Sequence, residues 1–486
     1  MAEGFLDRQW GRLDEVAENC INELVNRNLI QPIDIYDDGT VKYCRVHDMV
    51  LDLIISLSDE ENFATVLNGR AYNSFPNKIR RLSMQFSGKE HNGAVCAITE
   101  TKIYVRSLTT FPQFEQIPHI VLVDFHALRV LDLARCYWLE NKHVKHIGSS
   151  RHLRYLRIGS GKITELPDEI GKLQHLETLD LRYCYSLLRL PSTMAQLRKL
   201  VRLSVSNATQ LPASGFRSLQ ALEELRFWKT DDPVRFAEEV NESGKCNLRH
   251  LRIGGEIAER LFCNPYSTYP CLQVLKIMSN IGMVPRGMAS LKNLVKLCIR
   301  VWEFDNEGLQ VLMGMPSMAH LQLLVIQDIK EKLTVGSNGF KLLKVFHFLY
   351  NRPATPFVFK HTASGGLRIS EKKTDGLRLT FAPGAVPALR RFCLDLNPMI
   401  VASDFLVHLG VEHLSGVAQL EVKIDCYRAV LGRVEALESS IEKAINLHPN
   451  REIFVHRVSE DFMFKDEKEW KEAVLKERKE MENFCR

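Results

Sequence analysis

The chain has 486 residues, of which 45% are hydrophobic and 25% are charged, and its formal net charge is +5. This composition is typical of a folded protein, but the length exceeds what one ordinary hydrophobic core supports. The small net charge gives no case for nucleic acid as a partner. No apolar run approaches the ~20 residues of a membrane-spanning helix, and the acidic start of the chain does not fit a signal peptide.

The twelve cysteines are scattered along the chain, and no two have the spacing Cys-x-x-Cys. Structural zinc sites and secreted disulfide frameworks both depend on regular cysteine spacings, so neither is expected. We therefore predict no metal site and a reducing compartment. The cytoplasm is the first choice, with the nucleus and the periphery of the plasma membrane as alternatives.

The N-terminal residues predict part of a winged-helix unit. Hydrophobic periodicity indicates one helix over 13–28 and another over 47–58. Between them, strands 32–36 and 41–46 flank an Asp-Asp-Gly-Thr turn, which is a strong hairpin signal. Winged-helix units often bind DNA, but this hairpin carries two basic side chains against two acidic ones. We expect a winged-helix segment over 1–58 that does not bind DNA.

After a linker over 59–78, the pattern Leu-x-x-Leu-x-Leu recurs along the chain, and its clear repeats begin at intervals of 22–26 residues. These intervals lie inside the window of about 20–29 residues for leucine-rich repeats. Clear repeats begin at Leu128, Leu153, Leu176, Leu200, Leu222, Leu248, Leu272 and Leu294, and poorer ones at Ile79, Val105, Met318, Leu343, Leu389 and Val417. The pattern predicts an α/β solenoid, a leucine-rich-repeat horseshoe over 79–425, in which each repeat packs only on its neighbours.

One gap breaks the period, because 46 residues separate Leu343 from Leu389. This gap is about two periods long. Residues 377–381 alternate apolar and polar side chains, so we predict that they supply the missing repeat strand.

The last sixty residues change character. An amphipathic helix is expected over 434–447, a short strand over 452–458 and a charged helix over 465–484. A solenoid needs a polar cover over its last open core. The segment 426–486 is therefore predicted to be an α/β C-terminal cap.

The repeat pattern separates inward side chains from outward ones. The strand leucines are expected to be buried, each contributing about 1.5–3 kcal/mol. Cys136 and Cys184 occupy the Asn/Cys position of the repeat, where a small side chain turns inward and satisfies backbone groups of the bend. Leu-Pro pairs at 166–167, 190–191 and 211–212 lie past the strands and turn the chain to the convex side. All of these residues are predicted to be structural.

The third, fifth, seventh and eighth positions of each repeat are predicted to face the concave side. They are rich in arginine, tyrosine and tryptophan, the residue types enriched at binding hot spots. Few acids interrupt them, so we predict a locally basic docking surface for an acidic protein partner; a merely solvated face is the alternative. The interrupting acids are Asp132, Asp180 and Glu224. The candidate partner-binding residues are Tyr155, Arg157, Arg182, Tyr183, Arg226, Trp228, Arg252, Lys276 and Arg300.

No arrangement of residues predicts catalysis. The motifs H-E-x-x-H and G-x-S-x-G are absent. Residues 159–162, Gly-Ser-Gly-Lys, look like the end of a phosphate-binding loop, but Leu156 stands where that motif needs its first glycine and Ile163 follows the lysine. We expect no enzyme activity and no catalytic residue.

In this setting the chain resembles the plant nucleotide-binding leucine-rich-repeat immune receptors, particularly the coiled-coil class of cereals. Val46-His47-Asp48 is similar to the family's Met-His-Asp motif, with valine in the first place. Residues 1–5 and 20–32 resemble the family's winged-helix segment, and 79–83 and 128–133 resemble its first repeats. The resemblance covers nearly the whole chain.

The resemblance implies a disease resistance protein whose repeats sense a pathogen effector or a guarded host protein in innate immunity, leading to a hypersensitive response. It implies that His47 contacts bound ADP and that Asp48 supports it, which holds the receptor closed. The coiled coil and most of the nucleotide-binding domain are missing from this chain. We expect no cofactor for the chain alone, because the phosphates would have no loop of backbone N–H groups; intact family members bind ADP or ATP. The concave strip could instead hold the receptor's own nucleotide-binding domain.

Two other functions stay open from the sequence. A stand-alone adaptor, such as a ubiquitin-ligase substrate receptor, would need a ligase-docking helix pair near the N-terminus, which the Asp-Gly hairpin does not fit. An ADP/ATP-dependent switch would need a phosphate-binding loop encoded upstream of Met1. Our hypothesis is that the chain is the sensing or autoinhibitory half of an immune receptor. We expect it to recognise a protein and not to bind specific nucleic acid.

Overall fold

The structure is a computed structural model that divides into two compact units, Met1–Leu261 and Phe262–Arg486. Each unit is built from parallel strands that follow one another in chain order. The residues described are 2–3, 5, 13–35, 41–67, 79–85, 104–111, 125–134, 136–212, 214–242, 247–263, 269–327, 329, 331–350, 357–361, 367–371, 378–401, 409–447 and 453–484.

The N-terminal segment contains two helices and a hairpin, as the sequence predicts. Helix α1 spans Leu13–Asn26 and helix α2 spans Asp48–Glu60. Strands β1 (Ile30–Ile35) and β2 (Val41–Val46) pair antiparallel, and the predicted turn between them lies outside the described residues. None of the side chains in α2 is buried within the described residues, although the helix is rich in Leu and Ile.

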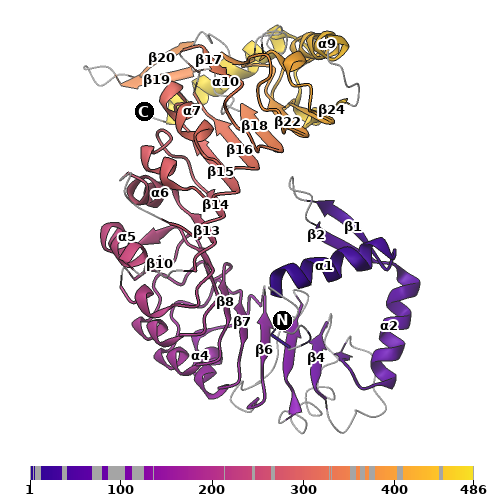
Figure 1. The fold of residues 1–486 in the computed structure, drawn as a ribbon, viewed down its shortest axis with the longest axis vertical. Helices are drawn as coiled ribbons and strands as arrows, with labels where there is room; N and C mark the ends of the chain where they lie inside the picture. Colours follow the sequence, from indigo (N-terminus) through magenta and orange to yellow (C-terminus); the bar gives the residue numbers. More distant parts are fainter. Residues whose placement is uncertain are drawn as a thin grey trace. The chain divides into compact units, whose positions relative to one another are not determined.

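The first unit carries a parallel sheet in which each strand pairs with the next one in the repeat array. Figure 1 shows β6, β7 and β8 side by side in this sheet. The first strand, β3, lies within the segment that the sequence predicts as a linker and pairs with β4. The strands are β3 (Thr65–Leu67), β4 (Arg81–Met84), β5 (Ser107–Thr110), β6 (Val130–Leu133), β7 (Tyr155–Ile158), β8 (Thr178–Leu181), β9 (Arg202–Val205), β11 (Glu224–Arg226) and β13 (His250–Ile253).

Buried and half-buried side chains alternate along these strands because successive side chains of a strand point to opposite faces. The strand register places equivalent leucines next to one another, for example Leu156 beside Leu179 and Leu179 beside Leu203. These three leucines are completely buried, and each contributes about 1.5–3 kcal/mol to folding. The predicted leucine core is confirmed.

Short helices and a small sheet complete the first unit behind the leucine core. Pro167 and Pro191 stand at the start of two 3-10 helices, which is the structural role predicted for the Leu-Pro pairs. Their fixed backbone angle suits a chain that leaves the strand and enters a helical turn. The elements are α4 (Asn141–Val144), η4 (Ile147–Ser149), η5 (Asp168–Lys172), η6 (Ser192–Gln196), η7 (Phe216–Ser218), α5 (Pro233–Glu242), α6 (Gly255–Leu261) and the paired strands β10 (Gln210–Leu211) and β12 (Lys229–Thr230).

The second unit repeats the same plan with longer strands and a more aromatic interior. Phe346, Phe381 and Phe392 pack on one another, with ring centroids 5.4–6.4 Å apart. All three rings are almost completely buried. The strands and accompanying helices are β14 (Val274–Ile277), η8 (Arg286–Ser290), β15 (Lys296–Val301), α7 (Asn306–Met313), β16 (His320–Val325), β18 (Val345–Tyr350), β22 (Arg391–Leu396), η9 (Val411–His413) and β23 (Gln419–Asp425).

The prediction that residues 377–381 supply a missing repeat strand is wrong. Strand β18 pairs directly with β22 over six residue pairs, so no repeat strand lies between them. Strand β21 (Leu379–Phe381) instead pairs with β17 (Leu333–Val335) in a separate two-stranded sheet. The apolar side chains of this alternating segment, Leu379 and Phe381, are buried in that position. The gap is an insertion that also holds the hairpin β19 (Phe357–His361) and β20 (Leu367–Glu371).

The C-terminal elements match the predicted helix, strand and helix. They are α9 (Leu431–Leu447), β24 (Ile453–Val458) and α10 (Glu467–Phe484), with a 3-10 turn η10 (Glu460–Phe462) between the last two. Strand β24 pairs parallel with β23, so the sheet continues into the segment assigned to the cap. Ion pairs join the strand and the helices: Arg457 contacts Glu438 at 2.7 Å, and Arg433 contacts Glu467 at 2.6 Å. No helix in the described part of the chain is long and apolar enough to cross a membrane.

Candidate functional site

The first-unit strand face is the surface formed by the third, fifth, seventh and eighth positions of the repeats from β6 to β13. The parallel register sets equivalent side chains beside one another across neighbouring strands. At the fifth position it aligns Asp132 with Arg157 and Arg157 with Asp180. Further along, it aligns Ser204 with Arg226 and Arg226 with Arg252. Neighbouring strands lie about 4.8 Å apart, so each of these side chains can reach the next one.

Asp180 is the centre of an ion-pair network. Its carboxylate accepts from Nε and Nη2 of Arg182 at 2.6–3.0 Å and contacts Nε of Arg157 at 3.4 Å. Arg157 also contacts Asp132 at 3.5 Å. Burial raises the pKa of the Asp132 carboxyl, and the charge of Arg157 offsets only part of that rise. The two arginines are held by the two acids, and their guanidinium groups lie 5.7 and 5.9 Å from the ring centre of Tyr183.

A second acid, Glu224, joins two basic side chains on the neighbouring strands. It lies 3.1 Å from Nε of Arg202 and 3.5 Å from Nδ1 of His250. Burial opposes its ionisation, but the hydrogen bond to His250 and the charge of Arg202 outweigh burial and lower the pKa of Glu224 to about 2. Glu224 is therefore ionised at neutral pH.

Changing Glu224 to glutamine should lower the free energy of unfolding at pH 7 by about 1–2 kcal/mol, allowing for the solvent screening of a half-buried pair. The folded pKa lies below the ordinary value of 4.5, so this stability is complete above about pH 4.5 and is lost as the pH falls towards 2. Urea unfolding between pH 7 and 3 should show the difference from wild type narrowing below pH 4.5. A Glu165→Gln control, at an exposed position, should differ little from wild type throughout. A pH-independent difference for Glu224→Gln would contradict the assignment.

No ion pair is described for Arg226 and Arg252, and Asp180 acts on Arg226 only through its charge at longer range. Burial lowers the pKa of Arg226, and the like charges of Arg182 and Arg252 lower it further. Its guanidinium lies 4.8 Å from the ring centre of Trp228. Nε of Arg226 is buried and has no hydrogen-bond partner among the described residues. These two arginines border an open groove of about 340 Å³ that also contains Asp180, Arg182 and Glu224.

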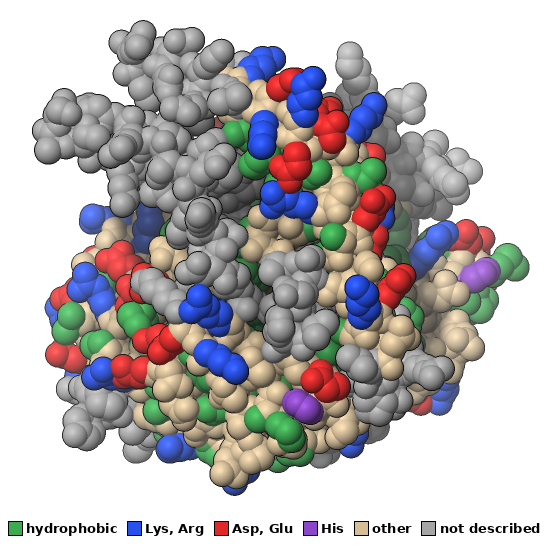
Figure 2. Space-filling view, turned by 90° about the horizontal axis from the view of Figure 1, so that it is seen from above, with side chains coloured by type: hydrophobic (Ala, Val, Ile, Leu, Met, Phe, Trp, Pro, Cys, Tyr) green, Lys and Arg blue, Asp and Glu red, His purple; other side chains and the backbone are tan. Residues whose placement is uncertain are grey.

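The face therefore carries paired acids and bases, and the predicted locally basic docking surface stays a prediction. The three acids counted as interruptions each contact one or two arginines, and no ion pair is described for Arg226 and Arg252. Figure 2 shows acidic and basic side chains interspersed on the described part of another face of the molecule. Net charge alone cannot select a partner at this face. The partner must match the arrangement of the individual acidic and basic side chains.

The predicted partner-binding residues lie in both units. Those from Tyr155 to Arg252 lie on the first-unit strand face, where the side chains are half-buried. Lys276 on β14 and Arg300 on β15 belong to the second unit. Sequence reasoning missed two exposed aromatic side chains just past the strands, Tyr137 and Tyr185, of which Tyr185 makes an edge contact with Tyr183. Both tyrosines occupy the tenth position of their repeats, and this shared position could have identified them in the sequence.

The second unit has its own charged cluster, which sequence reasoning did not identify. Glu421 contacts Arg391 at 2.8 Å and Lys423 at 3.2 Å. His347, which is buried, lies 3.1 Å from Asp395. Burial opposes the ionisation of Glu421, but its two basic neighbours outweigh burial and lower its pKa. This cluster is internally paired, and it stabilises the neighbouring strands β22 and β23.

His47 and Asp48 lie at the start of α2. His47 is the N-cap residue, and its Nδ1 accepts from the backbone N–H of Met49 at 3.3 Å. Asp48 contacts Arg45 at 3.5 Å. All of these side chains are exposed. The geometry assigns His47 a capping role, and its predicted contact with a nucleotide stays a prediction.

Cys136 and Cys184 are buried, as predicted for the Asn/Cys position. The thiol of Cys136 lies 2.8 Å from the hydroxyl of Thr110, and the thiol of Cys184 donates to the carbonyl of Ile158 at 3.3 Å. Burial raises the pKa of both thiols to about 11. Each thiol thus satisfies a polar group of the preceding repeat, which confirms the structural role.

The buried thiols should resist alkylation, because the thiolate is the reactive form. In the native protein at pH 8, iodoacetamide should modify the exposed Cys20 and Cys44 first. Cys136 and Cys184 should react only after denaturation. Peptide mass spectrometry over a time course measures the four rates; similar rates for the two pairs would contradict the assignment.

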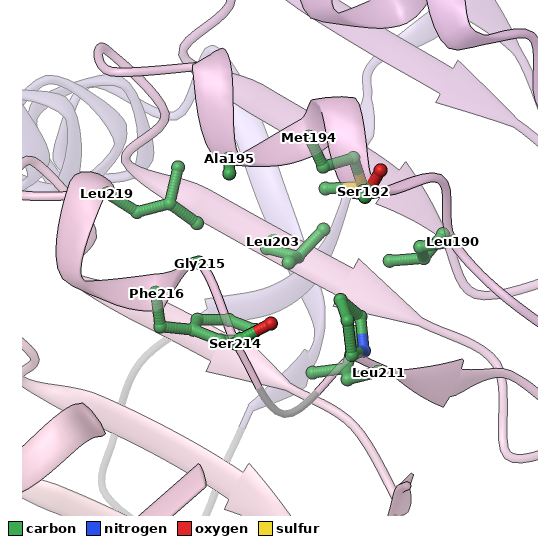
Figure 3. A pocket seen from close by; sticks show the side chains of 11 residues that line it. Leu190, Ser192, Met194, Ala195, Leu203, Leu211, Ser214, Gly215, Phe216 and Leu219 are labelled. Carbon is green, nitrogen blue, oxygen red and sulfur yellow. The ribbon is translucent and has the colours of Figure 1, made fainter. Parts of the chain in front are cut away.

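A small cavity between η6, β9 and η7 does not add a ligand site. Figure 3 shows the side chains that line it, including Met194, Leu203 and Phe216. Its volume is about 20 Å³, which is enough for one water molecule, and its wall is mostly apolar. Within the described residues no group of His, Cys, Asp and Glu side chains could hold a metal ion.

The strand periodicity, the leucine core and an open strand face define a leucine-rich-repeat protein. The family described as "Leucine-rich repeat region" matches residues 104–264 and 243–454, and the family "Disease resistance protein Winged helix domain" matches residues 1–54. The chain belongs to the plant disease resistance proteins that combine a winged helix with leucine-rich repeats. This confirms the family that the sequence resemblance implied.

Several relatives come from rice, Oryza sativa subsp. japonica. Disease resistance protein Pik-2 is 28% identical over 72% of this chain and 42% of its own length. Disease resistance protein RGA5 is 27% identical over 92% of this chain and 42% of its own length. The chain thus spans less than half the length of these relatives. A solved structure, the LRIM1/APL1C complex, is 11% identical, with 85% of this chain and 70% of that chain covered and a TM-score of 0.40.

Proposed function

We propose that this chain is the recognition part of a plant immune receptor and that the first-unit strand face binds a protein. The partner is a pathogen effector, a guarded host protein or the receptor's own nucleotide-binding domain. The observation that carries the proposal is the row of half-exposed Arg, Tyr and Trp side chains around Tyr183, Arg226 and Trp228. Such residues carry much of the binding energy at protein interfaces.

The rigidity of this surface supports the proposal. Arg157 and Arg182 are fixed by Asp180, and both flank the ring of Tyr183. A side chain that is already ordered loses less conformational entropy on binding.

The receptor role is tested genetically. Disrupting the gene in the plant of origin should abolish hypersensitive cell death after challenge with at least one isolate from a panel of pathogens. A wild-type transgene should restore the response, and a Tyr183→Ala, Trp228→Ala transgene should not. Matched expression of both transgenes, measured by immunoblot, separates loss of recognition from loss of folding. Unchanged resistance after disruption, across the whole panel, would refute the proposal.

Recognition without catalysis fits the absence of enzyme motifs noted in the sequence. The exposed pair His47 and Asp48 stays available to contact ADP when a complete nucleotide-binding domain is present. For this chain alone we expect no cofactor. The buried thiols of Cys136 and Cys184 are free cysteines, which supports a reducing compartment, with the cytoplasm as our proposal.

The chain alone should not bind ADP measurably. Nucleotide phosphates need a cradle of backbone N–H groups or cations, and His47 alone cannot supply one. Isothermal calorimetry with up to millimolar ADP and Mg²⁺ should show only heats of dilution. Micromolar affinity would contradict this expectation and favour a nucleotide-dependent switch.

A further inference from the structure

The fifth repeat position carries a charge pattern that changes along the first unit. From β6 to β13 the aligned side chains are Asp132, Arg157, Asp180, Ser204, Arg226 and Arg252. The first arginine of this row lies between two carboxylates, at 3.5 and 3.4 Å. Arg226 lies between Ser204 and another arginine. The pattern Asp-Arg-Asp in the first half therefore becomes Ser-Arg-Arg in the second.

This change leaves a position where a carboxylate is missing. Arg226 and Arg252 are adjacent in register, and no ion pair of either with a carboxylate is described. Nε of Arg226 is buried without a hydrogen-bond partner in the described chain. A buried polar atom without a partner is costly, so an anion bound beside this nitrogen would be favoured.

The space beside these arginines is open. Ser204 is small, and it lines the 340 Å³ groove together with Arg226 and Arg252. Trp228 lies against the guanidinium of Arg226, with 4.8 Å between that group and the ring centre. A side chain entering above Ser204 would meet both arginines.

We propose that Arg226 and Arg252 form a two-arginine cradle that binds the carboxylate of an Asp or Glu side chain on the protein partner. The partner's acid would take the place beside Arg226 that Asp132 and Asp180 take beside Arg157. Carboxylate is the group that the protein itself uses against arginine on this face, in paired geometry. The inference rests on the proposed function and names the chemistry of the partner at one position.

The test uses the full chain and a fluorescein-labelled hexaglutamate peptide as the probe, measured by fluorescence anisotropy at low salt. The double variant Arg226→Gln, Arg252→Gln should weaken binding at least tenfold. The matched control, Arg198→Gln with Arg235→Gln, makes the same change in net charge at exposed positions outside the groove and should bind within twofold of wild type. Equal affinity of the double variant and the control would overturn the cradle.

A gain-of-charge variant gives an independent test. S204D places a carboxylate of the chain's own beside Arg226, so it should block the peptide at least tenfold, whereas S204N, of similar size and neutral, should not. Equal loss in S204D and S204N would overturn the proposal, because size alone would then explain it. Melting temperatures of all variants confirm folding.

Competition identifies the anion. If the cradle takes a carboxylate, acetate should displace the peptide at a concentration no higher than that of inorganic phosphate, at equal ionic strength. Displacement by phosphate alone would overturn the carboxylate assignment in favour of a phosphate group. The gene-disruption experiment does not depend on the cradle, so failure of the cradle and failure of the receptor role can be told apart.

Discussion

Replacing Asp180 with alanine should lower the free energy of unfolding by about 2–4 kcal/mol, one of the two largest effects expected in this molecule. The carboxylate is buried and is shared by Arg157 and Arg182. It also accepts from the backbone N–H of Arg182 at 3.1 Å. Removing it leaves two partly buried guanidinium groups close together and one backbone group without its partner.

Two comparisons separate charge from packing in this prediction. Asp180→Asn keeps an acceptor for the backbone N–H of Arg182 and should lose less stability than alanine. Asp168→Ala, on an exposed residue of η5, should change stability by less than about 0.5 kcal/mol. Denaturant unfolding at pH 7 measures all three. If Asp180→Ala and Asp168→Ala lowered the free energy of unfolding by the same small amount, the ion pairs of Asp180 would not stabilise the fold.

Much of the fold could be predicted because the same spacing of apolar residues recurs in every repeat. The same buried position is occupied by Leu156, Leu179 and Leu203 in successive repeats. A wrong assignment of buried and exposed positions in one repeat is therefore corrected by the pattern of its neighbours. The prediction of a repeat strand at residues 377–381 failed because this segment had no clear repeats beside it for comparison. An alternating apolar segment shows that a strand forms, but only the partner decides its sheet, and here the partner is β17. Nothing in the spacing distinguishes an insertion from two poor repeats.

The candidate site could be predicted less completely than the fold. The repeat positions show which side chains lie on the strand face, and Arg226 and Trp228 were found in this way. Whether an acid interrupts a basic surface or neutralises it depends on the register between strands that are more than twenty residues apart. That register sets Asp180 beside Arg157 and leaves Ser204 beside Arg226. A charge count along the sequence therefore gives the net charge of the face but not which arginines are paired with acids.

Replacing Phe392 with alanine should lower the stability of the second unit by about 3–5 kcal/mol. The ring is stacked on Phe346 at 5.4 Å and makes an edge contact with Phe381 at 5.7 Å. It therefore joins the repeat strand β18 to the insertion strand β21. Its loss opens a cavity that no neighbour can fill, because all three rings are buried and tightly packed.

Hydrogen exchange measures where this effect appears. In a solenoid each repeat depends on its neighbours, so exchange in Phe392→Ala should accelerate in β16, β18, β21, β22 and β23. Strands β6 to β9 of the first unit should keep wild-type rates. Leu342→Ala, at an exposed side chain, is the control and should leave all these strands unchanged. Uniform acceleration in both units would mean that the chain unfolds as one cooperative block. The aromatic cluster would then stabilise the whole array, and the insertion could not be regarded as a local addition to one repeat.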